Sequence, residues 1–381
     1  MVTTCRHYGE CGGCDFRELD YAAQLDYKTT YCRNLFASFG CTPDPIVASP
    51  RDNFFRNKME FTVSGSLEKP VIGQRVKDRF DKVVNLEECP LFAEDCPSML
   101  AAVRQWLSDT DTPPYDVKKQ TGELRYVSLR HSKSSGGYLV TIVACLSDKA
   151  FEGARARYVE LGERLSKIAQ VESFYVSLNV SRSDTAVSGK LVLLKGKEFI
   201  TEKINGVEYI IRPETFFQTN PGCCERLYAK VLEFLGADTE QHIYDVYCGS
   251  GGIALQLANA KRRVTGIDIS PRNIEAAREN CKHNKLKAEF FDQDADEFIS
   301  QLKETDPWSL IVDPPRNGLT KKFIGILEAS GPGQFVYVSC NPLKLREDLK
   351  KLVSYQVARI VPVDMFPHTR HIEVVAALKR K

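Results

Sequence analysis

The sequence predicts an α/β protein whose C-terminal part is a Rossmann-like, doubly wound sheet. Three observations point to this class. Strand-like apolar runs alternate with helix-like segments from residue 213 onward, residues 54–210 contain mainly strand-like runs, and three cysteines occur within the first fourteen residues. We therefore expect a cysteine-rich segment over residues 1–45, an α+β domain over 46–212 and the doubly wound domain over 213–381.

The N-terminal segment is predicted to contain one helix behind its cysteines. Apolar residues such as Leu25, Leu35 and Phe36 recur among charged ones between residues 21 and 39. Because glycine often follows the last residue of a helix, Gly40 marks the expected end.

The middle segment is predicted to consist mainly of strands. Helices are expected over residues 96–108 and 150–169, and strands over 58–64, 124–130, 138–146 and 173–180. The second helix would join two strands in a βαβ-like unit. Between residues 198 and 212, Asn205-Gly206 separates two short apolar runs, which is a strong local signal for a hairpin. The boundary to the last domain is placed directly behind this hairpin.

The C-terminal segment alternates strands and helices. Strands are expected over residues 242–247, 263–267, 287–291, 309–312, 335–338 and 373–378. Because ligands of such sheets bind at the carboxyl ends of parallel strands, side chains at these strand ends are the first candidates for a functional site.

Composition narrows the class of protein. The chain has 381 residues, 43% of them hydrophobic, and a net charge of +2, which gives no overall argument for nucleic-acid binding. It has no run of eighteen apolar residues and no leader-like start, so we expect a cytoplasmic protein without membrane segments. We also expect a monomer. In a reducing compartment its thirteen cysteines should be thiols, metal ligands or catalysts.

A glycine-rich turn follows the first predicted strand of the last domain. The sequence Tyr247-Cys248-Gly249-Ser250-Gly251-Gly252 leads into a helix, and Asp268, placed to bind ribose hydroxyls, ends the next strand. A nicotinamide cofactor is one interpretation. However, the third glycine of the dinucleotide motif is missing, and Asp245 would repel a pyrophosphate. S-adenosylmethionine, a cationic sulfonium with a ribose, fits better; an ordinary tight turn is the alternative without a ligand.

One cysteine lies where chemistry is expected. Cys340 follows a strand-like run and precedes a proline-containing turn, downstream of a second such turn that begins with Asp313. A thiol and a carboxylate at neighbouring strand ends could face one bound molecule, and a thiolate there could attack it. The alternative is a small buried apolar side chain.

Several segments together match one family. They are residues 55–59, 63–70, 122–126, 213–220, 245–251, 313–316, 339–342 and 364–375. On these segments the chain resembles the RNA uracil-C5 methyltransferases, and most closely the 23S ribosomal RNA branch that lacks an N-terminal TRAM barrel. The resemblance implies S-adenosylmethionine-dependent formation of 5-methyluridine in 23S ribosomal RNA.

The resemblance also assigns roles to residues. It implies that Cys340 is the nucleophile and Glu373 the base, and that the methyl donor is held by Gln218, Tyr247, Gly249, Asp268, Asp294 and Asp313. The chain departs from the family pattern at Asp268, where glutamate is usual, and at Asp292-Gln293-Asp294, which replaces Gly-Asp.

The chemistry explains why these residue types are needed. Carbon 5 of uracil is a weak nucleophile, and attack of a thiolate on carbon 6 makes it electron-rich enough to take a methyl group. A carboxylate must then remove the carbon-5 proton. The target uridine should be flipped from its stack or lie in a loop.

Alternatives remain for two of these residues. Glu373 could be a surface carboxylate, and Asp313 could cap a turn or accept from uracil N3–H instead of the cofactor. His368 and His371 are interpreted as orienting or RNA-facing groups, because two histidines do not make a metal site.

The N-terminal cysteines form a separate candidate site. Cys5, Cys11 and Cys14 fall within ten positions, and Cys89 resembles the distant fourth ligand of a [4Fe–4S] cluster in this family, with Cys96 as the second choice. Zinc bound by four cysteines is the physical alternative. We expect a structural cluster without an open iron site.

Two other functions are considered. One is a transfer-RNA uracil-C5 methyltransferase, and the other is a catalytically inactive iron–sulfur protein that binds RNA or assists ribosome assembly. Contacts to RNA are expected from two groups of basic and aromatic residues. A solvated basic face is the alternative. The two groups are Arg51, Phe54, Phe55, Arg56 and Lys58, and Arg125, Arg130 and Lys133.

Overall fold

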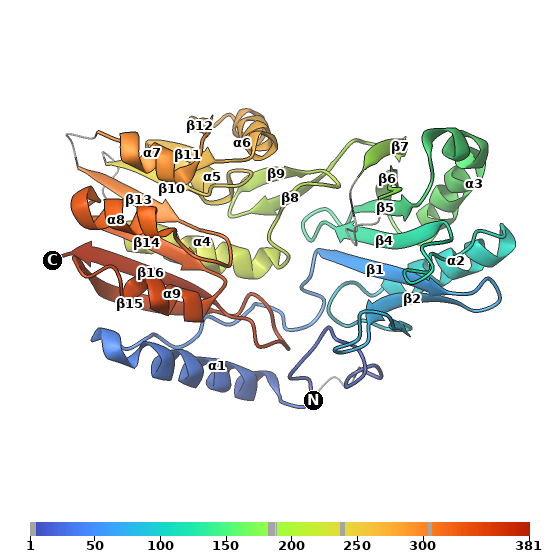
Figure 1. The fold of residues 1–381 in the computed structure, drawn as a ribbon, viewed down its shortest axis with the longest axis horizontal. Coiled ribbons are helices and arrows are strands. Elements are labelled where there is room, and N and C mark those ends of the chain that lie inside the picture. The colour runs from blue at the N-terminus through green and yellow to red at the C-terminus, as the bar shows by residue number, and fades with distance from the viewer. Residues whose placement is uncertain (1–4, 182–186, 188, 237–240, 304–306) are drawn as a thin grey trace. The chain divides into compact units, whose positions relative to one another are not determined.

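The computed structural model describes residues 5–181, 187, 189–236, 241–303 and 307–381, and the chain divides into two compact units (Figure 1). The first unit comprises Met1–Asp20, Arg51–Glu202 and Ile210–Glu214, and the second comprises Tyr21–Pro50, Lys203–Tyr209 and Thr215–Lys381. These compact units follow a different division from the three predicted segments, because residues 21–50 group with the C-terminal part of the chain.

The first unit is built on a seven-stranded sheet in the order β3-β2-β1-β4-β5-β6-β7. Its strands are β1 (Lys58–Gly65), β2 (Pro70–Arg75), β3 (Val83–Asn85), β4 (Leu124–His131), β5 (Tyr138–Ala144), β6 (Val171–Leu178) and β7 (Lys190–Gly196). Strands β5 and β6 are parallel and joined by α3 (Asp148–Ser166), so the predicted βαβ unit is confirmed. All other pairs in this sheet are antiparallel.

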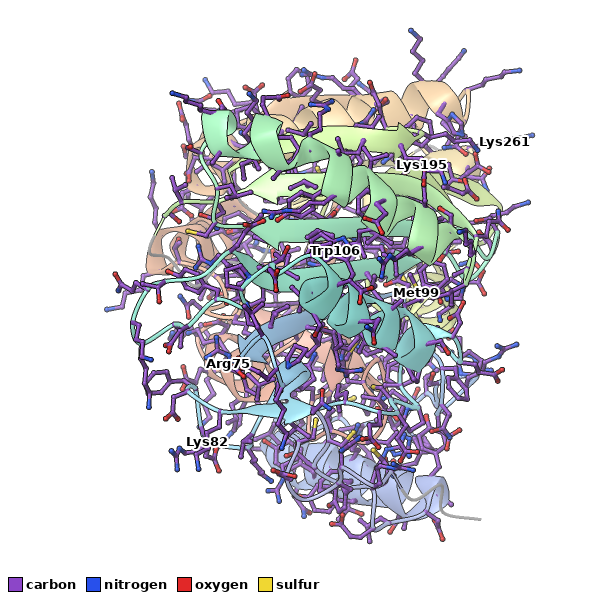
Figure 2. All side chains as sticks on the ribbon, turned by 90° about the vertical axis from the view of Figure 1, so that its right-hand side faces the viewer. Arg75, Lys82, Met99, Trp106, Lys195 and Lys261 are labelled. Carbon is purple, nitrogen blue, oxygen red and sulfur yellow. The ribbon has the colours of Figure 1, made fainter. Side chains whose placement is uncertain are left out.

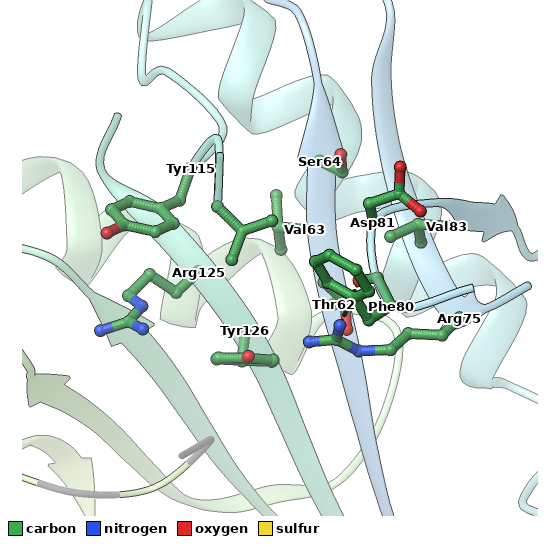
Figure 3. Close-up of a pocket in the computed structure, with 11 residues that line it drawn as sticks. Thr62, Val63, Ser64, Arg75, Phe80, Asp81, Val83, Tyr115, Arg125 and Tyr126 are labelled. Atoms are coloured by element: carbon green, nitrogen blue, oxygen red, sulfur yellow. Dashed lines mark hydrogen bonds between the residues drawn. The ribbon is translucent and has the colours of Figure 1, made fainter. Parts of the chain in front are cut away.

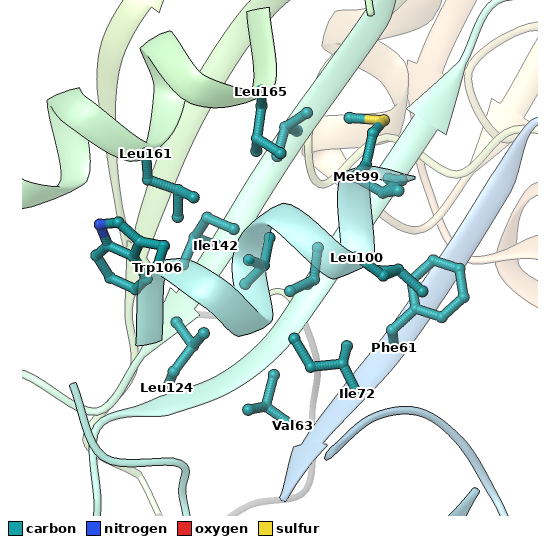
Figure 4. Close-up of a cluster of buried hydrophobic side chains, with 14 of the residues drawn as sticks. Phe61, Val63, Ile72, Met99, Leu100, Trp106, Leu124, Ile142, Leu161 and Leu165 are labelled. Atoms are coloured by element: carbon teal, nitrogen blue, oxygen red, sulfur yellow. The ribbon is translucent and has the colours of Figure 1, made fainter. Parts of the chain in front are cut away.

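The core of this unit lies between the sheet and two helices, α3 and α2 (Cys96–Asp109). Figure 4 shows Met99, Leu100 and Trp106 of α2 facing apolar side chains of the strands. Burial alternates along β1: Met59, Phe61 and Val63 belong to this core, whereas the residues between them are only partly buried. The other side chains of β1, from Lys58 to Ser64, therefore lie on the opposite, polar face of the sheet.

The second unit contains the predicted doubly wound sheet, in the order β12-β11-β10-β13-β14-β16-β15. Its strands are β10 (His242–Val246), β11 (Val264–Asp268), β12 (Glu289–Asp292), β13 (Trp308–Val312), β14 (Gln334–Ser339), β15 (Tyr355–Val363) and β16 (Glu373–Arg380). The first five strands in this order are parallel, and β16 is antiparallel to both β14 and β15. The strand order reverses at β10 and β13, where α/β sheets bind ligands.

Helices lie on both faces of this sheet (Figure 1). They are α4 (Pro221–Leu235), α5 (Gly252–Asn259), α6 (Pro271–His283), α7 (Ala295–Gln301), α8 (Lys321–Ser330) and α9 (Pro342–Leu349). One apolar core joins α7, α8 and α9 to the sheet and includes Cys32 and Phe36 of α1 (Tyr21–Phe36). This packing explains why residues 21–50 group with the second unit.

Local signals were accurate at two turns. The helix α1 continues as a short 3-10 turn, η1 (Ala37–Phe39), and Gly40 takes the left-handed conformation, φ 68°, so the predicted helix end is confirmed. The hairpin of β8 (Ile200–Ile204) and β9 (Val207–Ile211) turns at Asn205 and Gly206, with φ of 44° and 87°. Positive φ at both positions is what a two-residue hairpin loop requires.

Among the described residues, no helix combines the length and the apolar character needed to cross a membrane. The four residues before Cys5, on which the expectation of a leader-free start also rested, lie outside the described part of the chain.

Candidate active site

A cavity of about 670 Å³ opens at the carboxyl ends of the parallel strands in the second unit. Its size suits a cofactor-like ligand. Eight residues predicted for the site line it: Gln218, Tyr247, Gly249, Asp268, Asp294, Asp313, Cys340 and Glu373. The structure thus brings together side chains that are up to 155 positions apart in the sequence.

The glycine-rich turn and Asp268 form one side of the cavity. Tyr247, Gly249 and Gly251 have positive φ values of 68°, 55° and 86°, which let the chain turn tightly from β10 into α5. The Gly249 N–H donates to Asp268 Oδ2 at 3.0 Å, and Asp268 Oδ1 accepts from Asn273 Nδ2 at 3.0 Å and from the amide of Ser270. The carboxylate is therefore held at the cavity wall, and its oxygens can still accept from a ligand hydroxyl.

Asp245 is a buried carboxyl group beside the same turn. Its Oδ2 accepts from the Ala254 N–H at 2.9 Å, whereas Oδ1 has no hydrogen-bond partner among the described residues. Burial, followed by the nearby Asp313 carboxylate, raises the pKa of Asp245 to about 8. An orphaned carboxyl oxygen at a cavity wall suits a ligand that carries positive charge, such as S-adenosylmethionine.

Cys340 and Glu373 are brought together by strand register. In the antiparallel pair of β14 and β16, Ser339 lies opposite Val374. The next residue along β14 and the preceding residue along β16 are Cys340 and Glu373, so both face the same cavity at the same sheet edge. Cys340 is half-buried and Glu373 is buried.

The charges around this pair shift both pKa values. Burial, together with the Asp313 carboxylate, raises the pKa of Glu373 to about 8, and Arg316 opposes the shift. Burial also raises the pKa of the Cys340 thiol, and so do Glu373 and Asp313, while the Arg316 guanidinium lowers it. The pKa of Asp313 itself is raised to about 7 by burial. Arg316 therefore favours the thiolate against two neighbouring carboxylates.

Asn341 ties the two motif turns together. Its Nδ2 donates to the carbonyl oxygen of Arg316 at 3.1 Å, and its Oδ1 accepts from the Lys344 amide at the start of α9. The Asn341 N–H donates to Ser339 Oγ at 3.1 Å. These bonds fix the exit of β14, which carries Cys340, relative to the exit of β13.

The cavity includes apolar and aromatic residues that the sequence did not single out. Phe216 and Ile269 line it although they are 68% and 69% exposed, and Phe366 contributes from the loop before β16. Their exposure, which local sequence does not reveal, was the missing signal. His371, which the sequence did single out, also lines the cavity, and its ring centroid lies 5.9 Å from that of Phe366. His368 does not line the cavity: it is buried, and its backbone N–H and ring nitrogen both bond to the Gln24 side chain.

The four cysteines predicted as metal ligands line one small cavity in the first unit, of about 30 Å³. Burial, with smaller contributions from Cys14, Cys11 and Cys5, raises the pKa of Cys89 to about 12. Within the described residues, no group of three or more histidine, cysteine or acidic side chains is arranged to hold a metal ion. Cys96, the second choice for the fourth ligand, is fully buried and does not line this cavity.

Some residues predicted to contact RNA are buried. Arg125 and Arg130 are 3% and 4% exposed, and their side chains donate to backbone carbonyl groups of Ser181 and Pro213. Burial lowers the pKa of Arg130 to about 10. The phosphate-binding role expected for these two residues is therefore wrong in this structure, because their guanidinium groups are used within the unit.

The fold and the cavity define a class of protein. A doubly wound sheet, a glycine-rich first turn, an acidic residue at the end of the second strand and a cavity at the switch point are together typical of S-adenosylmethionine-dependent methyltransferases.

Comparisons with known proteins give the family. A family model described as tRNA (Uracil-5-)-methyltransferase matches residues 20–381. The chain is 34% identical to the tRNA (uracil(54)-C(5))-methyltransferase of Pyrococcus furiosus over 99% of this chain and 85% of that protein. It is 32% identical to the 23S rRNA (uracil(747)-C(5))-methyltransferase RlmC of Escherichia coli O127:H6 over 98% of each chain.

A solved structure agrees with these relatives. The tRNA (uracil-54, C5)-methyltransferase of Pyrococcus abyssi, in complex with S-adenosyl-L-homocysteine, is 31% identical and superposes with a TM-score of 0.81, covering 97% of this chain and 86% of that one. The chain belongs to the RNA uracil-C5 methyltransferase family, and the resemblance seen in its motifs is confirmed. It is an RNA uracil-5-methyltransferase that uses S-adenosylmethionine.

Proposed function

We propose that this protein methylates carbon 5 of a uridine in 23S ribosomal RNA through a covalent bond between Cys340 Sγ and carbon 6 of the uracil. The observation that carries the proposal is the pairing of Cys340 and Glu373 at the adjoining ends of β14 and β16, inside the cavity that also holds the cofactor candidates.

The methyl donor would lie against the glycine-rich turn. Asp268 would accept from its ribose hydroxyls, and Gln218, Tyr247, Gly249, Asp294 and Asp313, which line the same cavity, would hold the rest of the molecule. When bound, S-adenosylmethionine supplies a methyl group on a positively charged sulfur. The buried carboxyl oxygen of Asp245 supports this assignment because it offers an acceptor for the cationic part of the ligand.

The chain's own residues perform the remaining chemistry. The Cys340 thiolate attacks carbon 6 of uracil and forms a C–S bond, which places the electron pair of the former double bond on carbon 5 and oxygen 4. Carbon 5 takes the methyl group and retains its hydrogen. Glu373 then removes this proton, the double bond forms again, and the C–S bond breaks to return the thiolate of Cys340.

The charges in the cavity suit these steps. A base works best with a pKa near the working pH, and burial brings the pKa of Glu373 to about 8. Burial, Glu373 and Asp313 raise the pKa of the Cys340 thiol, and Arg316 is the neighbouring cation that opposes this rise and favours the thiolate. Phe216 is 68% exposed at the cavity, which suits stacking on an extruded uracil.

We also propose that Cys5, Cys11, Cys14 and Cys89 hold an iron–sulfur cluster of the [4Fe–4S] type. Four thiols around one cavity match the donor set of such a cluster. Since all four donors would be protein thiolates, the cluster would organise the first unit and take no part in methyl transfer.

The choice of 23S ribosomal RNA rests on a relative matched over 98% of both chains. A transfer-RNA substrate is the second candidate, because the Pyrococcus furiosus enzyme is slightly more identical, at 34%. The test is to incubate the purified protein and S-adenosylmethionine with unmodified transcripts of 23S ribosomal RNA and of transfer RNAs from its own organism, and to map 5-methyluridine. Methylation confined to transfer RNA would replace the 23S proposal, and methylation of neither RNA would refute both.

A further inference from the structure

A second cavity lies on the first unit, and none of the four cysteines lines it. It measures about 20 Å³ and is lined by Thr62, Ser64, Arg75, Phe80, Tyr115 and Tyr126, among others (Figure 3). Thr62 of β1 pairs with Tyr126 of β4, so both side chains stand on the sheet face opposite helices α2 and α3. No step of the proposed reaction uses these residues.

Phe80 is the most exposed large apolar side chain in the described part of the chain, at 71%. It lies in the turn between β2 and β3, which is closed by hydrogen bonds from the amide of Val76 to the Lys82 carbonyl and from the amide of Arg79 to the Val76 carbonyl. Arg75 Nη1 also donates to the Phe80 carbonyl. A hydrogen-bonded turn therefore presents an aromatic ring to solvent. Because the ring is mostly exposed, packing within the unit does not explain why an aromatic residue stands at this position.

The side of the hollow formed by Tyr115, Arg125 and Tyr126 is held in place by contacts within the unit. The guanidinium of Arg125 lies 4.7 Å from the centre of the Tyr115 ring and donates to the carbonyl oxygens of Ser181, at 2.7 Å, and Asn179, at 3.2 Å. Tyr126 is buried except for 8% of its surface. The hollow between Phe80 and these side chains is thus bounded by groups that are already held in place.

The surroundings of the hollow are basic. Residues 75–82 and 116–119 contain six lysines and arginines against three aspartates. Figure 2 shows Arg75 and Lys82 on the same part of the first unit. Lys118 pairs with Asp81, which lines the cavity, and this bond ties the two basic segments together.

We propose that Phe80 and the surrounding basic residues bind an unpaired nucleotide of the RNA substrate, with its base stacked on the Phe80 ring. A base stacks on an aromatic ring whatever its sequence, and nearby cations hold the phosphates. A protein partner would require a broad apolar patch, whereas here one ring stands over a shallow hollow. The inference rests on the proposed function only in taking RNA as the ligand.

The test measures binding of the full chain to a fluorescein-labelled oligouridylate and to a fully paired RNA duplex of the same length. Phe80→Ala should weaken binding of the single strand by about 5- to 150-fold, the range expected for one stacked base, and should affect the duplex much less. Phe80→Trp should bind as tightly as the unaltered chain, and Phe80→Leu should resemble the alanine variant, because stacking needs an aromatic face.

Phe291→Ala is the matched control, since Phe291 is also an exposed phenylalanine, at 46%, and does not line either cavity. Equal binding by Phe80→Ala and Phe291→Ala would overturn the proposal, and so would an equal loss for the duplex. These results are independent of methyl transfer. A protein that binds RNA through Phe80 but methylates none would refute the proposed function alone, and active enzyme with unaltered binding after Phe80→Ala would refute this site alone.

Discussion

Asp245, Asp313 and Glu373 are three acidic side chains around one cavity, and none of them has an ordinary pKa. Burial raises the pKa values to about 8, 7 and 8, and Asp313 raises those of the other two. A nearby positive charge would favour the ionised form of these three groups, and a sulfonium ligand would supply one.

These shifts predict how stability depends on pH. The folded-state pKa values lie above the unfolded values of about 4, so the stability that these groups contribute is complete below about pH 4 and is lost as pH rises through 7 to 8. The ligand-free protein should therefore unfold at a lower temperature at about pH 8.5 than at about pH 6, and S-adenosylmethionine should protect it more at the higher pH.

Asp245→Asn isolates the contribution of one group. This variant should lose part of the pH dependence in thermal unfolding scans without ligand, while Asp292→Asn, an exposed aspartate of β12, should keep all of it. An unchanged pH dependence in Asp245→Asn would contradict the assigned shift.

Cys340→Ala tests the nucleophile. The variant should lose turnover and should form no covalent complex with RNA containing 5-fluorouridine, because the sulfur that bonds to carbon 6 is gone. Binding of S-adenosylmethionine, measured by calorimetry, should stay within about twofold, since the cofactor is held by other residues. Retained methyl transfer would show that another group attacks the ring.

Among the secondary-structure elements, helix α1 makes buried contacts with the loop before β16 that its sequence did not indicate. Lys28 and Asp364 form a fully buried ion pair at 2.5 Å, and Lys28 Nζ also donates to the Phe366 carbonyl at 3.2 Å. Gln24 accepts from the His368 N–H at 2.9 Å. Through these bonds α1 holds the loop that carries Phe366 and leads to Glu373.

Breaking the ion pair should be costly. Lys28→Ala leaves a buried carboxylate without its partner, so the free energy of unfolding should fall by about 3–5 kcal/mol in urea titrations. The double variant Lys28→Met with Asp364→Leu removes both charges and should recover most of the loss. If the double variant is as unstable as Lys28→Ala, the cost comes from packing and not from charge.

How far sequence predicts structure differs between elements. The strands around the glycine-rich turn and the hairpin at Asn205 follow from apolar runs and turn residues, because both signals are local. Strands β2, β3, β7 and β15 were not predicted: β3 has three residues, β2 contains Gly73, and β15 contains Pro362. Pairing with neighbouring strands, which local sequence does not encode, gives these segments their structure.

The same limit applies to the site. Motif resemblance indicated Cys340 and Glu373, but their proximity depends on β16 entering the sheet between β14 and β15. Such a register joins residues 33 positions apart and has no local signature. Asp245 was noted only as a poor neighbour for pyrophosphate, because its burial and orphaned oxygen become visible only in the folded chain.

At the scale of the whole molecule, the two compact units carry different chemistry. The first holds the four-cysteine cavity and Phe80, and the second holds the catalytic cavity. If the cysteines hold a cluster, its loss should affect the first unit.

Cys14→Ser should therefore reduce bound iron and the visible absorbance of anaerobically purified protein, and it should lower the unfolding temperature. Cys145→Ser serves as the control, because Cys145 belongs to the same unit and does not line the cysteine cavity. Full iron content in Cys14→Ser, or no iron in the unaltered protein, would refute the proposed cluster.

The central claim is that Cys340 bonds to the uracil and Glu373 releases it. The most direct test is to mix Glu373→Gln with S-adenosylmethionine and unmodified substrate RNA, digest the product and identify the RNA-linked peptide by mass spectrometry. We expect a stable adduct on the Cys340 peptide that carries a methylated uracil, because proton removal from carbon 5 is blocked. Free 5-methyluridine at the normal rate, without any adduct on Cys340, would contradict the account.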